Sequence, residues 1–212
     1  MQKESFLTVN NDSSYSFVIE KSKFICYLKH VESEDDARSF ITEIKKKHFD
    51  ATHNCSAFIA DEFGQIARFS DDGEPQGTAG FPMLDVLVKR EIKEVCAVVT
   101  RYFGGIKLGA GGLVRAYSSA VSMALDNADL VNKNLVQIIK VNCGFDTYSA
   151  LERLNSESTK IIDREFLGSV FVTFAVLLSE VENFKKTLTE TFLGKEKYEE
   201  LGTRYELFKV TK

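Results

Sequence analysis

Residues 93–112 read KEVCAVVTRYFGGIKLGAGG, and the fold of the first half of the chain can be worked out from this pattern. The valines, with a cysteine and an alanine between them, are typical of a strand that is buried on both faces of a sheet. Five glycines follow, and we expect a long helix after them, to about Asp129. The stretch therefore predicts a buried strand (93–102), a glycine-rich connection (104–112) and a helix.

The composition is that of a folded chain. Apolar residues make up 44% of the 212 residues, and 17 phenylalanines with 7 tyrosines supply core material that disordered chains lack. Nine of the 13 glycines, and both prolines, lie between residues 64 and 112. Residues with special backbone properties are therefore concentrated in under a quarter of the chain.

The segments before this stretch predict two hairpins and two helices. Apolar and polar side chains alternate at 14–19 and 23–31, which is typical of paired strands. Ser33, with Asp36 three residues later, is a typical helix start. In chain order we expect strands at 14–19 and 23–31, a helix after Ser33, strands at 53–60 and 65–70, and a helix from an N-cap at Thr78 to about Arg90.

A polar stretch, Asn-Lys-Asn at 132–134, begins the second half of the chain and is taken as a domain boundary. We expect domains at 1–132 and 133–212, in an α+β fold. The second half predicts a strand at 135–143, a helix at 147–156, strands at 159–165 and 168–178, a helix at 180–193 and a strand at 198–210. This βαββαβ order is the ferredoxin-like pattern, in which two helices cover one face of a four-stranded antiparallel sheet.

Charge and hydropathy exclude several classes of protein. With 27 Lys and Arg against 31 Asp and Glu, the net charge is −4, so the chain is not a polycation built to wrap nucleic acid. The longest near-apolar run, at 171–178, is too short to span a bilayer. We therefore expect a cytoplasmic protein that has no membrane contact. The sequence indicates no oligomeric state.

The cysteines and two of the histidines are expected to have no special chemistry. The four cysteines are widely spaced among apolar residues and form no Cys-x-x-Cys pair, so neither a disulfide scaffold nor a structural zinc site is indicated. His30 and His48 are expected to be ordinary surface or helix-end residues. We therefore expect no metal and no cofactor.

The glycine-rich segment has a local charge unlike that of the whole chain. From residue 95 to 125 the only charged residues are Arg101, Lys107 and Arg115. Backbone N–H groups at a helix N-terminus attract anions, and glycines let a phosphate approach the backbone closely. The segment therefore suits a phosphate-bearing ligand or an RNA backbone.

Two aromatic residues before the glycines leave two interpretations open. Tyr102 or Phe103 can offer a stacking face to a nucleic-acid base. Alternatively, the aromatic side chains lie in the core and the glycines only make a tight strand-to-helix connection, since neither a Walker A motif nor G-x-G-x-x-G is present.

An acidic loop at 71–75, Asp-Asp-Gly-Glu-Pro, is the counterpart of the basic segment. Clustered carboxylates can hold Mg²⁺ or Ca²⁺ or do acid–base work. Alternatively, Asp71 and Asp72 satisfy loop amides, as aspartate commonly does in turns, or pair with Arg101 or Arg115.

His53 is the histidine best placed in the sequence for chemistry. It shares a strand face with Cys55, two residues later, so the two can form a nucleophile pair. Against this, Cys55 has the surroundings of a buried thiol, whereas reactive thiolates need an exposed, electropositive site. A structural role for His53 is the other interpretation.

Two longer motifs resemble those of the YigZ/IMPACT family. Residues 71–80 read DDGEPQGTAG and resemble one hallmark, with Gln76 where a small residue is expected. Residues 80–84 (GFPML) and 98–109 (VVTRYFGGIKLG) resemble its other signature. The resemblance spans the chain, which is similar to the bacterial two-domain members.

The resemblance implies both fold and function. It implies a first domain with the ribosomal protein S5 domain 2-like fold and a ferredoxin-like second domain, like domains IV and V of elongation factor G. Eukaryotic members of the family regulate translation initiation, so it also implies a link to translation.

We expect a non-enzymatic regulator or binding module that engages RNA or a ribosome-associated protein through the glycine-rich, locally basic face of the first domain. The alternative is a small enzyme that binds a phosphorylated or nucleotide substrate at the glycines and uses the acidic loop as its metal or acid–base group. The expected binding residues are His53, Asp71, Asp72, Glu74, Thr78, Arg101, Tyr102, Phe103, Gly104, Gly105, Lys107, Gly109, Gly111, Gly112 and Arg115.

Overall fold

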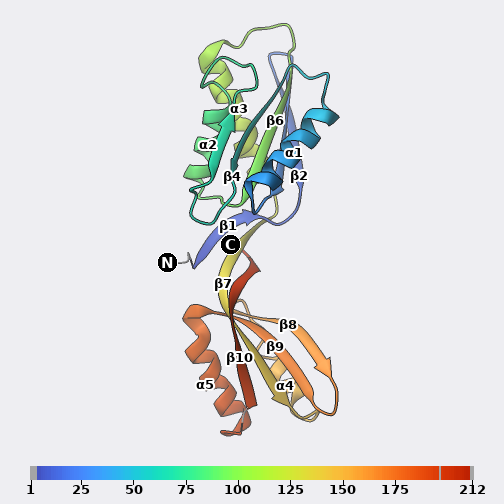
Figure 1. The fold of residues 1–212 in the computed structure, drawn as a ribbon, viewed down its shortest axis with the longest axis vertical. Coiled ribbons are helices and arrows are strands. Elements are labelled where there is room, and N and C mark those ends of the chain that lie inside the picture. The colour runs from blue at the N-terminus through green and yellow to red at the C-terminus, as the bar shows by residue number, and fades with distance from the viewer. Residues whose placement is uncertain (1–3, 196, 211–212) are drawn as a thin grey trace. The chain divides into compact units, whose positions relative to one another are not determined.

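The structure, a computed structural model, describes residues 4–195 and 197–210 (Figure 1). The chain divides into two compact units: residues 6–131 form one, and residues 132–212 with the N-terminal residues up to Ser5 form the other. Each unit mixes helices with a β-sheet. Among the described residues, no helix is both long and apolar enough to cross a membrane.

Residues 6–131 are built on a five-stranded antiparallel sheet with the order β2-β3-β6-β4-β5. Its strands are β2 (Ser13–Ile19), β3 (Ser22–His30), β4 (His53–Ile59), β5 (Ala67–Ser70) and β6 (Val95–Tyr102). β6 lies in the middle, and its residues 95–101 are all buried. The prediction of a strand buried on both faces is therefore confirmed.

Helices cover both faces of this sheet (Figure 1). Alternate residues of β6, such as Ala97 and Val99, pack with α2 (Gly80–Lys89) and α3 (Gly109–Asp126). The intervening Val98 packs with α1 (Glu34–Lys47) on the other face. Because successive side chains of a strand point to opposite faces, a single strand anchors both helical layers.

The helix and turn signals are confirmed in two places. The Ser33 hydroxyl accepts a hydrogen bond from the Asp36 amide at 3.1 Å, so Ser33 is the N-cap of α1. Gly64 has φ +77°, a left-handed conformation that favours glycine, in the turn between β4 and β5.

Other expectations need correction at the ends of helices. The predicted N-cap at Thr78 is wrong, because Ala79 occupies the N-cap of α2 while the Thr78 hydroxyl donates to the Pro75 carbonyl at 2.6 Å. The glycine-rich connection is shorter than 104–112, since α3 begins at Gly109.

The second unit has a sheet in which β7 (Leu130–Cys143) is central. Its elements in chain order are β7, α4 (Tyr148–Glu152), β8 (Thr159–Phe166), β9 (Val170–Leu177), α5 (Val181–Phe192) and β10 (Lys197–Lys209). The strand order is β10-β7-β9-β8, and β1 (Ser5–Val9), which the sequence did not predict, also pairs with β7. α4 and α5 pack on the same face of the sheet, through Leu151 and Leu188.

The polar stretch 132–134, taken as a domain boundary, lies within a strand. It lies inside β7, which begins at Leu130 rather than at residue 135. A polar side chain is compatible with a strand where one face of the sheet is solvated, so polarity alone did not mark a loop here.

Candidate functional site

A cavity of about 430 Å³ lies in the first unit, where four parts of the chain meet. It is lined by Thr52 and His53 at the start of β4, by Glu74 and Pro75 from the acidic loop, by Arg101 and Phe103 at the end of β6, and by residues 107–110 with Leu113 around the start of α3. The acidic loop and the glycine-rich segment, which the sequence singled out separately, therefore contribute to one cavity.

A buried ion pair lies in the wall of this cavity. Arg101 Nη1 donates to Glu74 Oε1 at 2.7 Å, and the two residues are 5% and 8% exposed. The Tyr117 hydroxyl, from α3, donates to the same carboxylate at 2.8 Å. Burial raises the pKa of Tyr117 far above its ordinary value, so this hydroxyl remains a donor. Glu74 therefore serves to hold Arg101 and Tyr117 in place.

Arg101 is fully enclosed but not fully paired. Its guanidinium lies 5.5 Å from the ring centroids of both Phe24 and Phe103. Its Nη2 donates to the Ser22 hydroxyl at 3.4 Å, whereas among the described residues Nε meets no hydrogen-bond acceptor. A buried donor without a partner costs about 1–3 kcal/mol.

His53 lines the cavity in a defined tautomer. Its Nδ1 lies 2.9 Å from the backbone carbonyl of Asp72, which can only accept, so Nδ1 carries the proton. In the neutral ring Nε2 therefore has a free lone pair. This atom lies 3.8 Å from Glu74 Oε2 and forms an ion pair with it when the ring is protonated.

Cys55 does not form the nucleophile pair with His53 that the sequence left open. Its thiol donates to the Asp71 carbonyl at 2.9 Å, and burial raises its pKa to about 12. A thiol with that pKa is protonated at neutral pH and is not a nucleophile.

The carboxylates of the acidic loop are occupied by donors from the protein. Asp71 accepts hydrogen bonds from the amides of Gly77, Ala79 and Gly80 at 2.8–3.0 Å. Asp72 accepts from the Asn54 amide and from Lys45 Nζ, both at 2.6 Å.

These contacts favour the interpretation in which the acidic residues satisfy the amides of the loop over the one in which they bind a metal ion. With Glu74 paired to Arg101, each carboxylate in the loop has a structural partner. Thr78 is 6% exposed, and its hydroxyl donates a hydrogen bond to the Pro75 carbonyl, so its role is also structural.

Of the predicted glycines, Gly109 alone is among the described residues that line the cavity, and the others have different places. Gly109 lines it and has φ +67°, at the first turn of α3. Gly104 is required by packing, because a Cβ there would lie 2.0 Å from the Lys21 backbone carbon. Gly105 has φ +88° in the open part of the connection, and Gly111 and Gly112 lie within the first turn of α3.

The predicted basic and aromatic residues do not all lie at the same cavity. Lys107 and Phe103 are exposed and line the cavity. Arg115 lines a second cavity of about 410 Å³, which Lys107 borders as well. Tyr102 points elsewhere, since its hydroxyl donates to Asp50 at 3.0 Å and lies 2.9 Å from His48 Nδ1.

The sequence did not indicate several residues of the site. Tyr117, Ser22 and the apolar residues Pro75, Leu108 and Leu113 all belong to it. Pro75 and Leu108 lie inside motifs that pointed to function. Tyr117 and Leu113 come from α3 and Ser22 from the start of β3, where their residue types are ordinary.

Comparison with known proteins finds a matching domain family and several similar proteins. Residues 20–125 match the Impact N-terminal domain. The IMPACT family member YvyE of Bacillus subtilis is 46% identical over 90% of this chain and 88% of its own length. The IMPACT family member YigZ of Escherichia coli is 37% identical over 83% of this chain and 88% of its own length.

A solved structure extends this likeness to the fold. The crystal structure of a hypothetical protein aligns with 99% of this chain and 98% of its own, with a TM-score of 0.61 and 32% sequence identity. The alignment covers both units, and the identity of the relatives extends over most of the chain. The chain belongs to the IMPACT family.

Proposed function

We propose that the chain is a non-enzymatic, translation-linked binding module that takes a phosphate group of an RNA partner into the cavity of the first unit. One observation supports this most strongly. Arg101 is 5% exposed and lines the cavity together with Gly109 and Ala110 from the N-terminal turn of α3. A phosphate in the cavity would interact with the guanidinium and with the amides at the helix start.

The surroundings of the cavity support a nucleic-acid ligand. Lys107, on the rim, adds a positive charge, and the exposed ring of Phe103 offers a stacking face. The first turn of α3 contains no acidic residue that would repel a phosphate. A ribosome-associated protein is the other partner class, and the binding experiment below separates the two.

The link to translation rests on family membership. The family resemblance implies a link to translation, and the two motifs that carry the resemblance, at 71–80 and 98–109, both contribute residues to the cavity. A role in translation would place the protein in the cytoplasm.

The finer fold assignments are part of the same proposal. We assign the first unit to the ribosomal protein S5 domain 2-like fold and the second to the ferredoxin-like fold, with the domain boundary near residue 132. The strand order β10-β7-β9-β8, with α4 and α5 on one face, supports the second assignment.

Binding of a labelled RNA at low salt, with cosedimentation on ribosomes, tests the proposal. Lys107→Glu combined with Arg115→Glu should abolish both signals, and the wild-type affinity should fall steeply as salt rises. Arg38→Glu combined with Lys89→Glu is the charge-matched control, since both side chains are exposed elsewhere on this unit. Unchanged RNA binding by the first pair contradicts the proposal. Ribosome cosedimentation without RNA binding instead indicates a protein partner.

A small enzyme acting on a phosphorylated or nucleotide substrate is the second candidate, because His53 Nε2 faces a cavity with its tautomer fixed. A neutral imidazole in that position can act as a general base. A hydrolysis screen with nucleotides decides the matter. Turnover that is lost in His53→Gln establishes the enzyme, whereas no turnover in the wild type removes it.

A further inference from the structure

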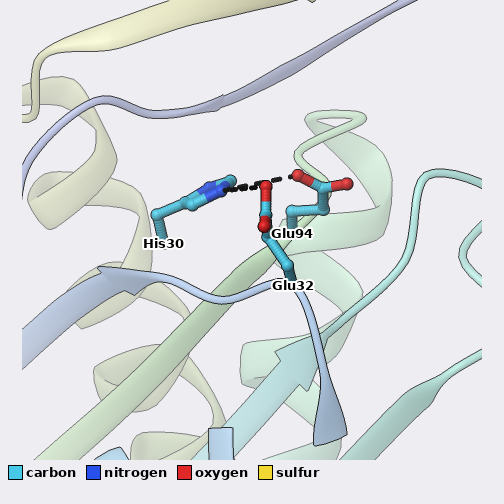
Figure 2. A group of neighbouring side chains, drawn as sticks. All are labelled: His30, Glu32 and Glu94. Atoms are coloured by element: carbon cyan, nitrogen blue, oxygen red, sulfur yellow. Dashed lines mark hydrogen bonds and ion pairs between the residues drawn. The ribbon is translucent and has the colours of Figure 1, made fainter. Parts of the chain in front are cut away.

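Three metal-ligating side chains gather in the first unit, apart from the cavity described above: His30, Glu32 and Glu94 (Figure 2). His30 ends β3, Glu32 follows it in the turn toward α1, and Glu94 immediately precedes β6. His30 pairs with Val95 across the two strands, so the sheet register brings the histidine beside Glu94. Their ligating atoms all lie within 4.8 Å of one another.

Thr8 determines which imidazole nitrogen is available. The Thr8 hydroxyl donates to the backbone carbonyl of Glu94 at 3.2 Å, and its oxygen lies 2.9 Å from His30 Nδ1. Because its single hydrogen is used on that carbonyl, the hydroxyl accepts a hydrogen bond from Nδ1–H. Nε2 is then the unprotonated nitrogen in the neutral ring. Such support of the far nitrogen is typical of metal-binding histidines.

The free nitrogen faces two carboxylates. His30 Nε2 lies 3.3 Å from Glu32 Oε1 and 3.5 Å from Glu94 Oε2. Dashed lines mark the interactions among these residues in Figure 2. A lone pair that faces two carboxylate oxygens is repelled by them unless a cation lies between. The arrangement therefore requires either a proton on Nε2 or a metal ion shared by the three atoms.

The donor set, with the two spacings from His30 Nε2, indicates the class of metal. In a tetrahedral zinc site with bonds of about 2.0–2.1 Å, neighbouring ligand atoms are about 3.3–3.4 Å apart. In an octahedral Mg²⁺ site the same bond lengths place neighbouring ligands about 2.9–3.0 Å apart. The two spacings from His30 Nε2, 3.3 and 3.5 Å, suit a tetrahedral arrangement better than an octahedral one, and imidazole with carboxylate is a donor set that suits Zn²⁺.

We propose that His30, Glu32 and Glu94 bind one divalent transition-metal ion of the Zn²⁺ class in tetrahedral geometry. Three protein ligands leave the fourth position for water or another ligand. The Glu32 side chain is 62% exposed and that of Glu94 only 7%, so the ion enters from the side of Glu32 and is held against the sheet by Glu94. The site is independent of the cavity and of the proposed function.

Metal titration of the chelator-treated full chain tests the proposal. Zn²⁺ in competition with a chromophoric chelator should show one tight equivalent per chain, whereas Mg²⁺ and Ca²⁺ should not compete. Co²⁺ should give the intense visible bands of a tetrahedral site. His30→Ala and Glu32→Gln should each weaken Zn²⁺ binding at least tenfold and remove those bands.

Matched variants keep the result specific. Glu34→Gln changes a nearby acidic residue that pairs with Arg38 instead, and His48→Ala removes a histidine that contacts Tyr27 and Tyr102. Both should bind Zn²⁺ as the wild type does, and circular dichroism checks that all variants fold. The proposal is overturned if the wild type takes up no Zn²⁺, if Glu32→Gln and His30→Ala bind it normally, or if Co²⁺ gives only the weak bands of octahedral coordination.

Discussion

Arg101 and Glu74 form an ion pair at 2.7 Å that is almost closed to solvent, although they lie on different elements and 27 residues apart. The pair links the end of the central strand to the acidic loop. The Tyr117 hydroxyl donates to the same carboxylate and so links α3 to the pair. The geometry of the cavity therefore depends on one buried charge cluster.

Removing one partner of this pair should destabilise the protein strongly. Glu74→Gln leaves the guanidinium of Arg101 buried without its counter-charge, which typically costs about 3–5 kcal/mol. Urea denaturation measures the loss in the free energy of unfolding. The control is Asp126→Asn, which breaks the exposed pair with Arg90 and should cost no more than about 1 kcal/mol. Equal losses in the two variants would contradict the importance assigned to the buried pair.

Asp71 should matter for stability more than its loop position suggests. Asp71→Ala removes the acceptor for three amides at the start of α2, and we expect a loss of about 2 kcal/mol, at the upper end for capping residues. The same denaturation measurement applies. Asp85→Ala, which only breaks an exposed pair with Lys89, should change stability by about 0.5 kcal/mol or less. A neutral Asp71→Ala would show that other donors or water replace the carboxylate.

Gly104→Ala should be poorly tolerated. Its Cβ would lie 2.0 Å from a backbone carbon of Lys21, so β6 and the β2–β3 turn would have to separate. Overpacking of this kind costs about 1–3 kcal/mol or more. Gly168→Ala is the control, because no described atom lies within 4 Å of a Cβ at that position. Equal melting temperatures for the two variants in thermal unfolding would contradict this prediction.

Stability should fall in alkaline solution because the buried thiols resist ionisation. Burial raises the pKa of Cys55 from 9.0 to about 12. The unfolded chain therefore releases this proton above about pH 9, while the folded chain keeps it until about pH 12. The contribution is fully present below pH 9 and is lost at about 1.4 kcal/mol per pH unit above it. Cys55→Ala should reduce the slope of unfolding free energy against pH by that amount, and an unchanged slope would refute the assignment.

The elements that depend on local patterns could be predicted from the sequence. The buried central strand follows from a run of valines, and the start of α1 follows from Ser33 and Asp36. The prediction of an N-cap at Thr78 was wrong, because the amides at the start of α2 are satisfied by Asp71, up to nine residues earlier. Because this acceptor is distant in the sequence, the capping contact cannot be recognised from the spacing of the residues next to the helix start.

The site could be predicted in its motifs but not in its contacts. The acidic loop and the glycine-rich segment were both singled out, yet only the fold shows that Glu74 meets Arg101. Tyr117 lies in a helix where an aromatic residue usually signals core packing, so its hydrogen bond to Glu74 could not be inferred. His30 and Glu94 are 64 residues apart in the sequence, and strand pairing alone brings them together.

The double burial of β6 has a consequence for how a ligand would be recognised. Arg101 is held by a strand enclosed between two helical layers, so the floor of the cavity is rigid before any ligand binds and would lose little conformational entropy on binding. The rim differs, because Phe103 and Lys107 are exposed and belong to the connection before α3. Under the proposed function, selectivity for the anion would therefore reside in the rigid floor, while the rim would adapt to the group that carries the anion.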